Sequence, residues 1–301
     1  MKDEKFRSGF AALVGRPNVG KSTLMNKFLG EKLAIMSDKP QTTRNKIQGV
    51  LNVPGAQIVF IDTPGIHKPQ HKLGEFMVRI ARNVLHEVDV ILFLVEADEA
   101  AGPGDKYIIE QLKEIDTPVI LVVNKIDLVA KNALLPLIDV YRGMMDFAGV
   151  VPVSAVSGDN LDQLQGEIVR YLPEGPQYYP EDMITDQPER MIMAELIREQ
   201  VLHLTRDEVP HSVAVDIDEV KPRPKEMVYV RATIYTERDS QKAIIVGKSG
   251  SMIGQIGSRA RREIENLLGS RVFLELYVKV SKDWRNKERS LRNLGYDTRG
   301  E

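Results

Sequence analysis

Residues 15–22 of this 301-residue chain read GRPNVGKS, a spacing of glycine, lysine and serine that could bind phosphate. The glycines let the backbone turn its N–H groups inward, and a helix start behind them adds further free N–H groups. We expect Lys21 to reach the β and γ phosphates and the Ser22 hydroxyl to bind a magnesium ion. The alternative, a glycine turn before an ordinary helix, is disfavoured by the complete Gly-Lys-Ser and by the apolar stretch ahead of it. The residues expected to contact the nucleotide here are Gly15, Arg16, Pro17, Asn18, Val19, Gly20, Lys21, Ser22 and Thr23.

A second pattern, Asp-x-x-Gly, follows an apolar stretch of strand length. In a phosphate-loop protein this Asp binds the magnesium ion, commonly through water, and the Gly N–H meets the γ-phosphate. Pro-Gly turns after strands are common, so the pattern gains its weight from its place after the phosphate loop. We assign Lys21, Asp62 and Gly65 to catalysis. The nucleotide contacts expected from this segment are Asp62, Thr63, Pro64, Gly65 and Ile66.

A third pattern, Asn-Lys-x-Asp, indicates which base is bound. A carboxylate at a strand end can accept hydrogen bonds from N1–H and the 2-amino group of guanine, whereas adenine offers neither donor and would leave the carboxylate unpaired. We expect Asp127 in this role, with Lys125 along the base and ribose and Asn124 tying this loop to the phosphate loop. Ser-Ala after the next strand could place a backbone N–H on the guanine 6-oxygen. The predicted base contacts are Asn124, Lys125, Ile126, Asp127, Ser154 and Ala155, and they favour GTP over ATP.

These patterns fall at the ends of apolar stretches that read as buried strands, between segments with helical spacing. The turn chemistry of Pro54-Gly55 joins the second and third strands in a hairpin. The order predicts an α/β P-loop domain with a mostly parallel sheet, one antiparallel edge strand and a ligand at the carboxyl ends of the strands. The expected strands are 10–14, 47–53, 57–61, 90–95, 119–123 and 150–153, and the expected helices are 22–29, one from 75, 106–115, 131–147 and 161–172.

The second half of the chain has another pattern, which begins after four prolines between residues 173 and 188. A helix over 188–204 precedes strands over 212–217 and 228–235, which are joined by Lys221-Pro222-Arg223-Pro224. A Gly-Lys-Ser-Gly loop, a basic helix and a strand over 273–280 follow. This is the layout of an α+β type II KH module, whose GxxG loop clamps a nucleic-acid backbone beside an apolar groove. The predicted RNA contacts are Gly247, Lys248, Ser249, Gly250, Arg259 and Arg262.

We therefore expect a GTP-binding domain over 1–172, a proline-rich, semi-extended linker over 173–187 and a KH domain with a C-terminal helix over 188–301. A helix-cap turn in a protein-interaction domain is the alternative to the KH assignment. The only tryptophan, Trp284, could stack on a base, although packing on the domain is its favoured use.

The amino-acid composition limits the classes of protein to which this chain can belong. The net charge of −2 hides a basic C-terminal segment, because residues 242–301 hold 13 Lys and Arg against 7 Asp and Glu. Such a segment suggests a polyanionic partner, and a solvated charged helix is the alternative. The absence of cysteine excludes disulfides and thiolate metal sites. Without a long apolar run or an apolar leader, we expect a soluble, cytoplasmic protein.

Over nearly the whole chain the order of the motifs resembles that of the Era family, which has a TrmE-Era-like G domain and a C-terminal KH domain. In chain order the motifs are GRPNVGKS, QTTR, DTPG, NKID, Ser-Ala and GKSG. The resemblance implies a bacterial-type, monomeric GTPase that binds small-subunit ribosomal RNA near its 3′ end and assists assembly of the small ribosomal subunit. It also implies a cytoplasmic protein with peripheral association at the cytoplasmic face of the membrane. Thr43 matches the catalytic switch threonine that closes over Mg²⁺, joining Ser22 and Asp62 as metal ligands. Asn18 matches a contact to K⁺, with local loop bonding as an equal alternative.

One residue departs from the Ras-like pattern, which places a water-orienting Gln directly after Asp-x-x-Gly. Ile66 stands at that position and cannot position water. Hydrolysis would then depend on Lys21, on cations and on a water held by the Thr42/Thr43 segment, so we expect the slow turnover of a molecular switch. A P-loop kinase or metabolic NTPase is disfavoured by the guanine motif and by the lack of a second substrate site. A GTPase whose C-terminal module binds a protein or membrane partner stays open.

Overall fold

The computed structural model describes residues 5–66, 69, 71–224 and 226–296, and these form two compact units. No helix among the described residues is both long enough and apolar enough to cross a membrane. The first unit takes its residues from 1–34, 43–69 and 77–186, and the second from 35–42, 70–76 and 187–301.

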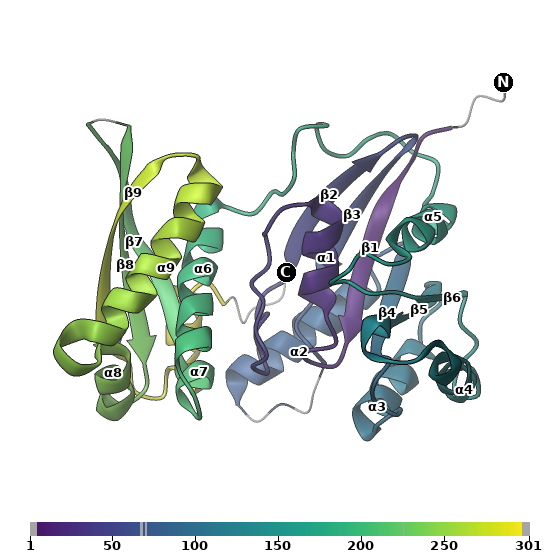
Figure 1. Ribbon diagram of the computed structural model, residues 1–301, viewed down its shortest axis with the longest axis horizontal. Coiled ribbons are helices and arrows are strands. Elements are labelled where there is room, and N and C mark those ends of the chain that lie inside the picture. The colour runs from purple at the N-terminus through teal and green to yellow at the C-terminus, as the bar shows by residue number, and fades with distance from the viewer. Residues whose placement is uncertain (1–4, 67–68, 70, 225, 297–301) are drawn as a thin grey trace. The chain divides into compact units, whose positions relative to one another are not determined.

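The first unit is built on a six-stranded sheet with the strand order β2-β3-β1-β4-β5-β6 (Figure 1). Every neighbouring pair is parallel except β2 and β3, which pair antiparallel from Ile47↔Asp62 to Val53↔Ala56. The predicted mostly parallel sheet with one antiparallel edge strand is thereby confirmed. Its elements are β1 (Arg7–Gly15), α1 (Lys21–Leu29), β2 (Ile47–Val53), β3 (Ala56–Asp62), α2 (Lys72–Leu85, of which residues 77–85 belong to this unit), β4 (Val90–Glu96), α3 (Pro103–Leu112), β5 (Val119–Asn124), α4 (Lys131–Arg142), β6 (Gly149–Pro152) and α5 (Leu161–Tyr171).

Helices cover both faces of this sheet. Residues of α2, α3 and α4 share one core cluster with alternate residues of the central strands, such as Val14 and Phe93. On the opposite face, Phe28 of α1 stacks on Phe60 of β3, with ring centroids 5.0 Å apart. Because both faces are covered, β3, β4 and β5 are buried along their whole length, which explains their uninterrupted apolar runs.

The proline-rich segment after α5 lies along the first unit in an extended conformation. Ser8 Oγ donates to the carbonyl of Pro176 at 2.6 Å, and Gln57 Oε1 accepts from the backbone N–H groups of Tyr178 and Tyr179. Val50 N–H donates to the carbonyl of Ile184 at 2.7 Å. These bonds hold the segment on the first unit, so it is extended but not a free spacer.

The second unit is a three-stranded sheet with the order β7-β8-β9, in which β7 and β8 are antiparallel and β8 and β9 are parallel. Figure 1 shows α6 and α9 on one face of this sheet. Leu196 of α6 and Ile256 of α9 are buried, as are Val230 and Ile234 of the central strand, so the core of this unit includes residues of both layers. The elements are α6 (Glu189–Leu204), α7 (Val209–Ser212), β7 (Ala214–Arg223), β8 (Met227–Thr236), α8 (Asp239–Val246), α9 (Ser251–Leu268), β9 (Arg271–Val280) and α10 (Glu288–Asn293).

Several expected boundaries were wrong in the first unit. The helix expected over 131–147 ends at Arg142, and the chain then turns so that Phe147 stacks on Phe93 in the core. The helix expected over 106–115 begins at Pro103, whose missing N–H suits a first helical position. The helix expected from residue 75 begins at Lys72.

A further boundary was wrong in the second unit. The segment Lys221 to Arg223, expected to join two strands, lies within β7. Pro222 is tolerated there because β7 is an edge strand of its sheet.

Candidate functional site: a phosphate loop and a GxxG groove

The phosphate loop connects the end of β1 to the start of α1. Gly15 and Gly20 both have positive φ, at 156° and 100°. A Cβ on Gly15 would lie 2.5 Å from the carbonyl oxygen of Leu94, and one on Gly20 would overlap the side-chain nitrogen of Asn124. Both positions therefore need glycine for conformation and for space. The turn leaves the free N–H groups at the start of α1 with no side-chain cap, as an anion site requires.

Lys21 is the first residue of α1, directly after the loop, and is 6% exposed. Its ammonium donates to the carbonyls of Gly15 at 3.2 Å and Arg16 at 2.8 Å. Burial lowers the pKa of Lys21 to about 8, against the opposing effect of the Asp62 and Glu96 carboxylates. A buried ammonium supported by carbonyl dipoles is a ready counter-charge for phosphate.

The three predicted magnesium ligands lie together. Ser22 Oγ donates to Asp62 Oδ2 at 2.6 Å, and Thr43 Oγ1 donates to the same oxygen at 3.2 Å. The two hydroxyls are 3.0 Å apart. Asp62 is fully buried, and burial raises its pKa although Lys21 and the hydroxyls favour its charged form. Its second oxygen, Oδ1, is buried and meets no hydrogen-bond donor among the described residues.

The Asp-x-x-Gly turn packs directly against the phosphate loop. Thr63 Oγ1 donates to the carbonyl of Leu13 at 2.8 Å, which fastens the turn to β1. A Cβ on Gly65 would lie 2.7 Å from the backbone nitrogen of Pro17, so the two loops touch through bare backbone. Pro64 is buried, and Ile66 is 2% exposed within the core cluster. Ile66 thus fills the core.

Asn124 joins the predicted base-binding loops to the phosphate loop. Its amide nitrogen donates to the carbonyl of Val19 at 2.8 Å, and its amide oxygen accepts from the Ala155 N–H at 3.0 Å. Ser154 is fully buried beside Ala155. In contrast, the Asp127 carboxylate is exposed at the end of the same strand–turn segment. The structure therefore brings the phosphate-loop, Asn-Lys-x-Asp and Ser-Ala segments together.

An ion-pair cluster beside this site was missed from the sequence. Glu96, the last residue of β4, accepts a hydrogen bond from Lys125 and lies 3.5 Å from Arg16. Arg16 also pairs with Asp105 at 2.9 Å and with Glu99 at 2.8 Å. The predicted contacts Arg16 and Lys125 are therefore held by carboxylates from β4, α3 and the segment between them. The only signal in the sequence was a charged residue at the end of a buried strand, Glu96.

The GxxG loop of the second unit forms a sharp turn between α8 and α9. Gly247 and Gly250 have φ of 72° and 79°, and Ser249 between them has φ of 51°. A Cβ on Gly247 would lie 2.7 Å from the backbone nitrogen of Met252. Lys248 and Ser249 are exposed at the tip of the turn. Their side chains are thus available to a ligand while the glycines keep the backbone accessible.

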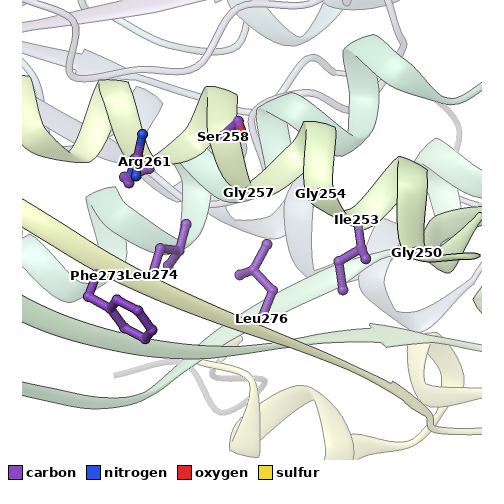
Figure 2. A pocket seen from close by; sticks show the side chains of 9 residues that line it. All are labelled: Gly250, Ile253, Gly254, Gly257, Ser258, Arg261, Phe273, Leu274 and Leu276. Carbon is purple, nitrogen blue, oxygen red and sulfur yellow. The ribbon is translucent and has the colours of Figure 1, made fainter.

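A groove of about 360 Å³ begins at this loop and runs between α9 and β9 (Figure 2). Its helix wall carries small residues, and its floor is apolar. The lining residues are Gly250, Ile253, Gly254, Gly257, Ser258, Arg261, Phe273, Leu274 and Leu276.

The predicted contacts Arg259 and Arg262 are exposed on α9 but are not among the groove-lining residues. The lining arginine is Arg261, which the expected RNA contacts omitted. Counting in helical steps from Gly250 through Gly254, Gly257 and Ser258 would have found it.

Trp284 is fully buried, and its indole N–H donates to the carbonyl of Ser212 at 2.8 Å. It stacks on Tyr296, with centroids 6.0 Å apart. The only tryptophan therefore packs inside the second unit, which is the role favoured from the sequence. It is not exposed for stacking on a base.

Comparison with known proteins gives two family matches. Residues 10–125 match the family described as 50S ribosome-binding GTPase, and residues 208–285 match the KH domain. The chain is 47% identical to a variant of Aquifex aeolicus Era bound to GDP and AlF4⁻, with a TM-score of 0.94 over 97% of this chain and 100% of that one. It is also 47% identical to Era in complex with MgGDPNP and nucleotides 1506–1542 of 16S ribosomal RNA, with a TM-score of 0.95 over 97% and 99% of the chains.

Proposed function

The chain belongs to the Era family of GTPases, as the order of its motifs predicted, and from this we propose that it is a GTP-hydrolysing switch that binds small-subunit ribosomal RNA. Its role would be to assist assembly of the small ribosomal subunit. The observation that carries the proposal is the presence, in one chain, of a phosphate loop with gathered metal ligands and of a KH groove behind a GxxG turn.

We propose that the nucleotide lies at the carboxyl ends of β1, β3 and β5. The backbone of residues 15–20 and Lys21 would bind the phosphates, and the backbone of Gly65 would meet the γ-phosphate. At the other end, Asp127 would accept hydrogen bonds from guanine, and Asn124 would keep its loop in register with the phosphate loop. The exposure of Asp127 and the two bonds of Asn124 support these roles.

The residues present fit a magnesium ion. Ser22, Thr43 and Asp62 bring two hydroxyls and a carboxylate together, the hard oxygen donors that Mg²⁺ prefers when a phosphate supplies the remaining ligands. The buried, unpartnered Oδ1 of Asp62 also suits a water-mediated contact to the ion. When bound, Mg²⁺ would neutralise charge on the phosphates. Asn18, exposed in the loop with φ of 69°, is the proposed contact for K⁺.

Hydrolysis would proceed without a side chain that orients water from the position after Gly65. Ile66 is buried in the core, so catalysis would depend on the positive charge of Lys21 and on a water held by the Thr42/Thr43 backbone segment. Without a positioned general base, we propose slow intrinsic turnover, as suits a switch.

In the second unit, the bare backbone of Gly247 and Gly250 would admit a sugar-phosphate chain, and Lys248 and Ser249 would contact phosphates. Arg259 and Arg262 remain proposed phosphate contacts on the exposed side of α9. The apolar floor of the groove would take unstacked bases, with Arg261 beside it.

We propose functional domains over 1–172 and 188–301, with the proline-rich connection over 173–187. We also propose a cytoplasmic, monomeric protein with peripheral association at the cytoplasmic face of the membrane. The basic C-terminal segment supports attraction to polyanions, including anionic lipid, as well as to RNA.

The experiment that tests the proposal uses the purified full chain. Hydrolysis of GTP and of ATP is measured with Mg²⁺, and binding of RNA with the sequence 1506–1542 of 16S ribosomal RNA is measured by fluorescence anisotropy. We expect hydrolysis of GTP only and saturable RNA binding. Crosslinking to cellular RNA followed by sequencing should then recover the small-subunit RNA. Hydrolysis of ATP at an equal rate would reject the nucleotide assignment, and absence of RNA binding would favour a protein or membrane partner.

A further inference from the structure

The three-stranded sheet of the second unit has an outer face on which, within this unit, no described helix packs (Figure 1). Along β9 the residues of one face alternate with those of the other, so Phe273, Glu275 and Tyr277 share the outer face. Phe273 is 49% exposed and Tyr277 is 46% exposed. Exposed aromatic side chains on an open sheet are unusual enough to call for an explanation.

Three side chains from three strands form a stack on this face, which we call the outer stack: Arg223 of β7, Tyr229 of β8 and Phe273 of β9. Tyr229 and Phe273 lie opposite each other in the parallel ladder, with ring centroids 6.1 Å apart and planes inclined by 21°. The guanidinium of Arg223 lies 4.4 Å from the Tyr229 ring centre and 5.0 Å from that of Phe273. A planar cation thus covers two aromatic rings.

The outer stack is held in place by a carboxylate. Glu275 accepts hydrogen bonds from the hydroxyls of Tyr229 and Tyr277, the latter at 2.9 Å. Cross-strand aromatic pairs stabilise sheets in their own right, which would account for Tyr229 against Phe273. Sheet stability does not call for a guanidinium over both rings, whereas a base can stack on a guanidinium plane as it does on a ring.

The outer stack is continuous with the groove through Phe273, which belongs to both. Figure 2 shows Gly250 at one end of the groove and Arg261 with Phe273 at the other. A chain that enters at the GxxG loop and follows the groove would therefore leave it beside Phe273, at the edge strand β9. Arg271 is exposed on the same face of β9, two residues from Phe273, so a cation lies beside this exit.

We propose that single-stranded RNA leaving the groove crosses the edge of β9 and stacks a base on the outer stack. The groove would then bind one part of the RNA and the outer face the next part, which lengthens the site beyond the GxxG module. This inference rests on the proposed RNA-binding function. RNA is the ligand proposed for the outer face because this face is continuous with the groove and because the Arg223 guanidinium lies over its two aromatic rings.

The test is a scan with abasic nucleotides on RNA of sequence 1506–1542 of 16S ribosomal RNA, measured on the full chain by fluorescence anisotropy. A single abasic nucleotide removes one base but keeps its sugar and phosphate. Loss of a base stacked on an aromatic platform weakens binding by about five- to a hundredfold. In the parent protein we expect such losses at the groove positions and at one or two positions beyond them.

Two variants separate the outer stack from the groove, because neither Arg223 nor Tyr229 lines the groove. With Tyr229→Leu, and with Arg223→Gln, the losses at the outer positions should disappear while those at the groove positions remain. Tyr229→Phe keeps the ring and should keep the parent profile. Tyr107→Leu removes an exposed aromatic side chain of the first unit and serves as the matched control.

The outcomes distinguish this inference from the function on which it rests. If the parent protein binds the RNA but Tyr229→Leu and Arg223→Gln give the parent's abasic profile, the outer stack does not bind RNA and the inference is overturned. If the folded parent protein binds no RNA, the proposed function fails and the inference with it.

Discussion

The side chain of Asn124 offers a quantitative test of how the nucleotide site is assembled. It is 2% exposed and makes two hydrogen bonds, to the carbonyl of Val19 and from the N–H of Ala155. Val19 is fully buried and Ala155 is 3% exposed, so both backbone groups lie away from water. Asn124→Ala would remove both bonds and leave a buried acceptor and a buried donor without partners. Each such group costs about 1–3 kcal/mol, so the free energy of unfolding should fall by about 2–6 kcal/mol.

The assay is equilibrium unfolding in urea, followed by circular dichroism without nucleotide, together with titration of GTP under native conditions. The midpoint of the first unit should move to lower urea. GTP affinity should fall more than tenfold, because the Asn124 hydrogen bond that connects the loop carrying Gly20 to the loop carrying Asp127 is lost. Asn83→Ala on the exposed side of α2 is the control and should change neither quantity. An unfolding free energy within about 0.5 kcal/mol of the parent value would refute the reasoning, because two buried groups cannot both lose their partners at no cost.

Three other predictions concern the base, the catalytic water and the RNA. Asp127→Asn should weaken GTP binding by about a hundredfold or more and gain affinity for XTP, because the new amide can donate to a 2-oxo group; competition binding with the two nucleotides checks this. Ile66→Val should lower the free energy of unfolding by about 0.5–1.5 kcal/mol and leave the rate of GTP hydrolysis nearly unchanged. Replacing K⁺ by Na⁺ should slow GTP hydrolysis, and equal rates in the two salts would reject the K⁺ contact. Lys248→Ala should weaken RNA binding and flatten its log–log salt slope by roughly 0.7; an unchanged slope would mean that Lys248 contacts no phosphate.

The order of elements and the motif positions could be predicted because each depends on local pattern. The strands of the first unit are buried on both faces, so β4 and β5 appear in the sequence as unbroken apolar runs. The motifs Asp62-x-x-Gly and Asn124-Lys-x-Asp follow such runs, and the carboxyl ends of neighbouring parallel strands meet at one edge of the sheet. Because β1 and β3 are neighbouring strands, Ser22, in the helix that follows β1, lies close to Asp62 at the end of β3.

What the sequence did not reveal depends on contacts between distant residues. The pairing of Arg16 with Asp105 joins residues 89 positions apart, and no local pattern marks either partner. The helix α4 ends at Arg142, directly before Gly143, and the packing of Phe147 on Phe93 that follows joins residues 54 positions apart. Arg261 differs from Arg262 only by the side of α9 on which it lies.

The central claim is that one chain carries a nucleotide site in its first unit and an RNA site at the GxxG loop of its second. The most direct measurement compares the parent with the double variant Lys248→Asp plus Ser249→Asp, for RNA affinity at several salt concentrations and for GTP hydrolysis without RNA. Both residues are exposed at the tip of the loop, so the fold should tolerate the changes. We predict that RNA binding is nearly abolished by like-charge repulsion while the rate of GTP hydrolysis is unchanged. Unchanged RNA affinity in the double variant would contradict the account and assign the C-terminal module to a protein partner.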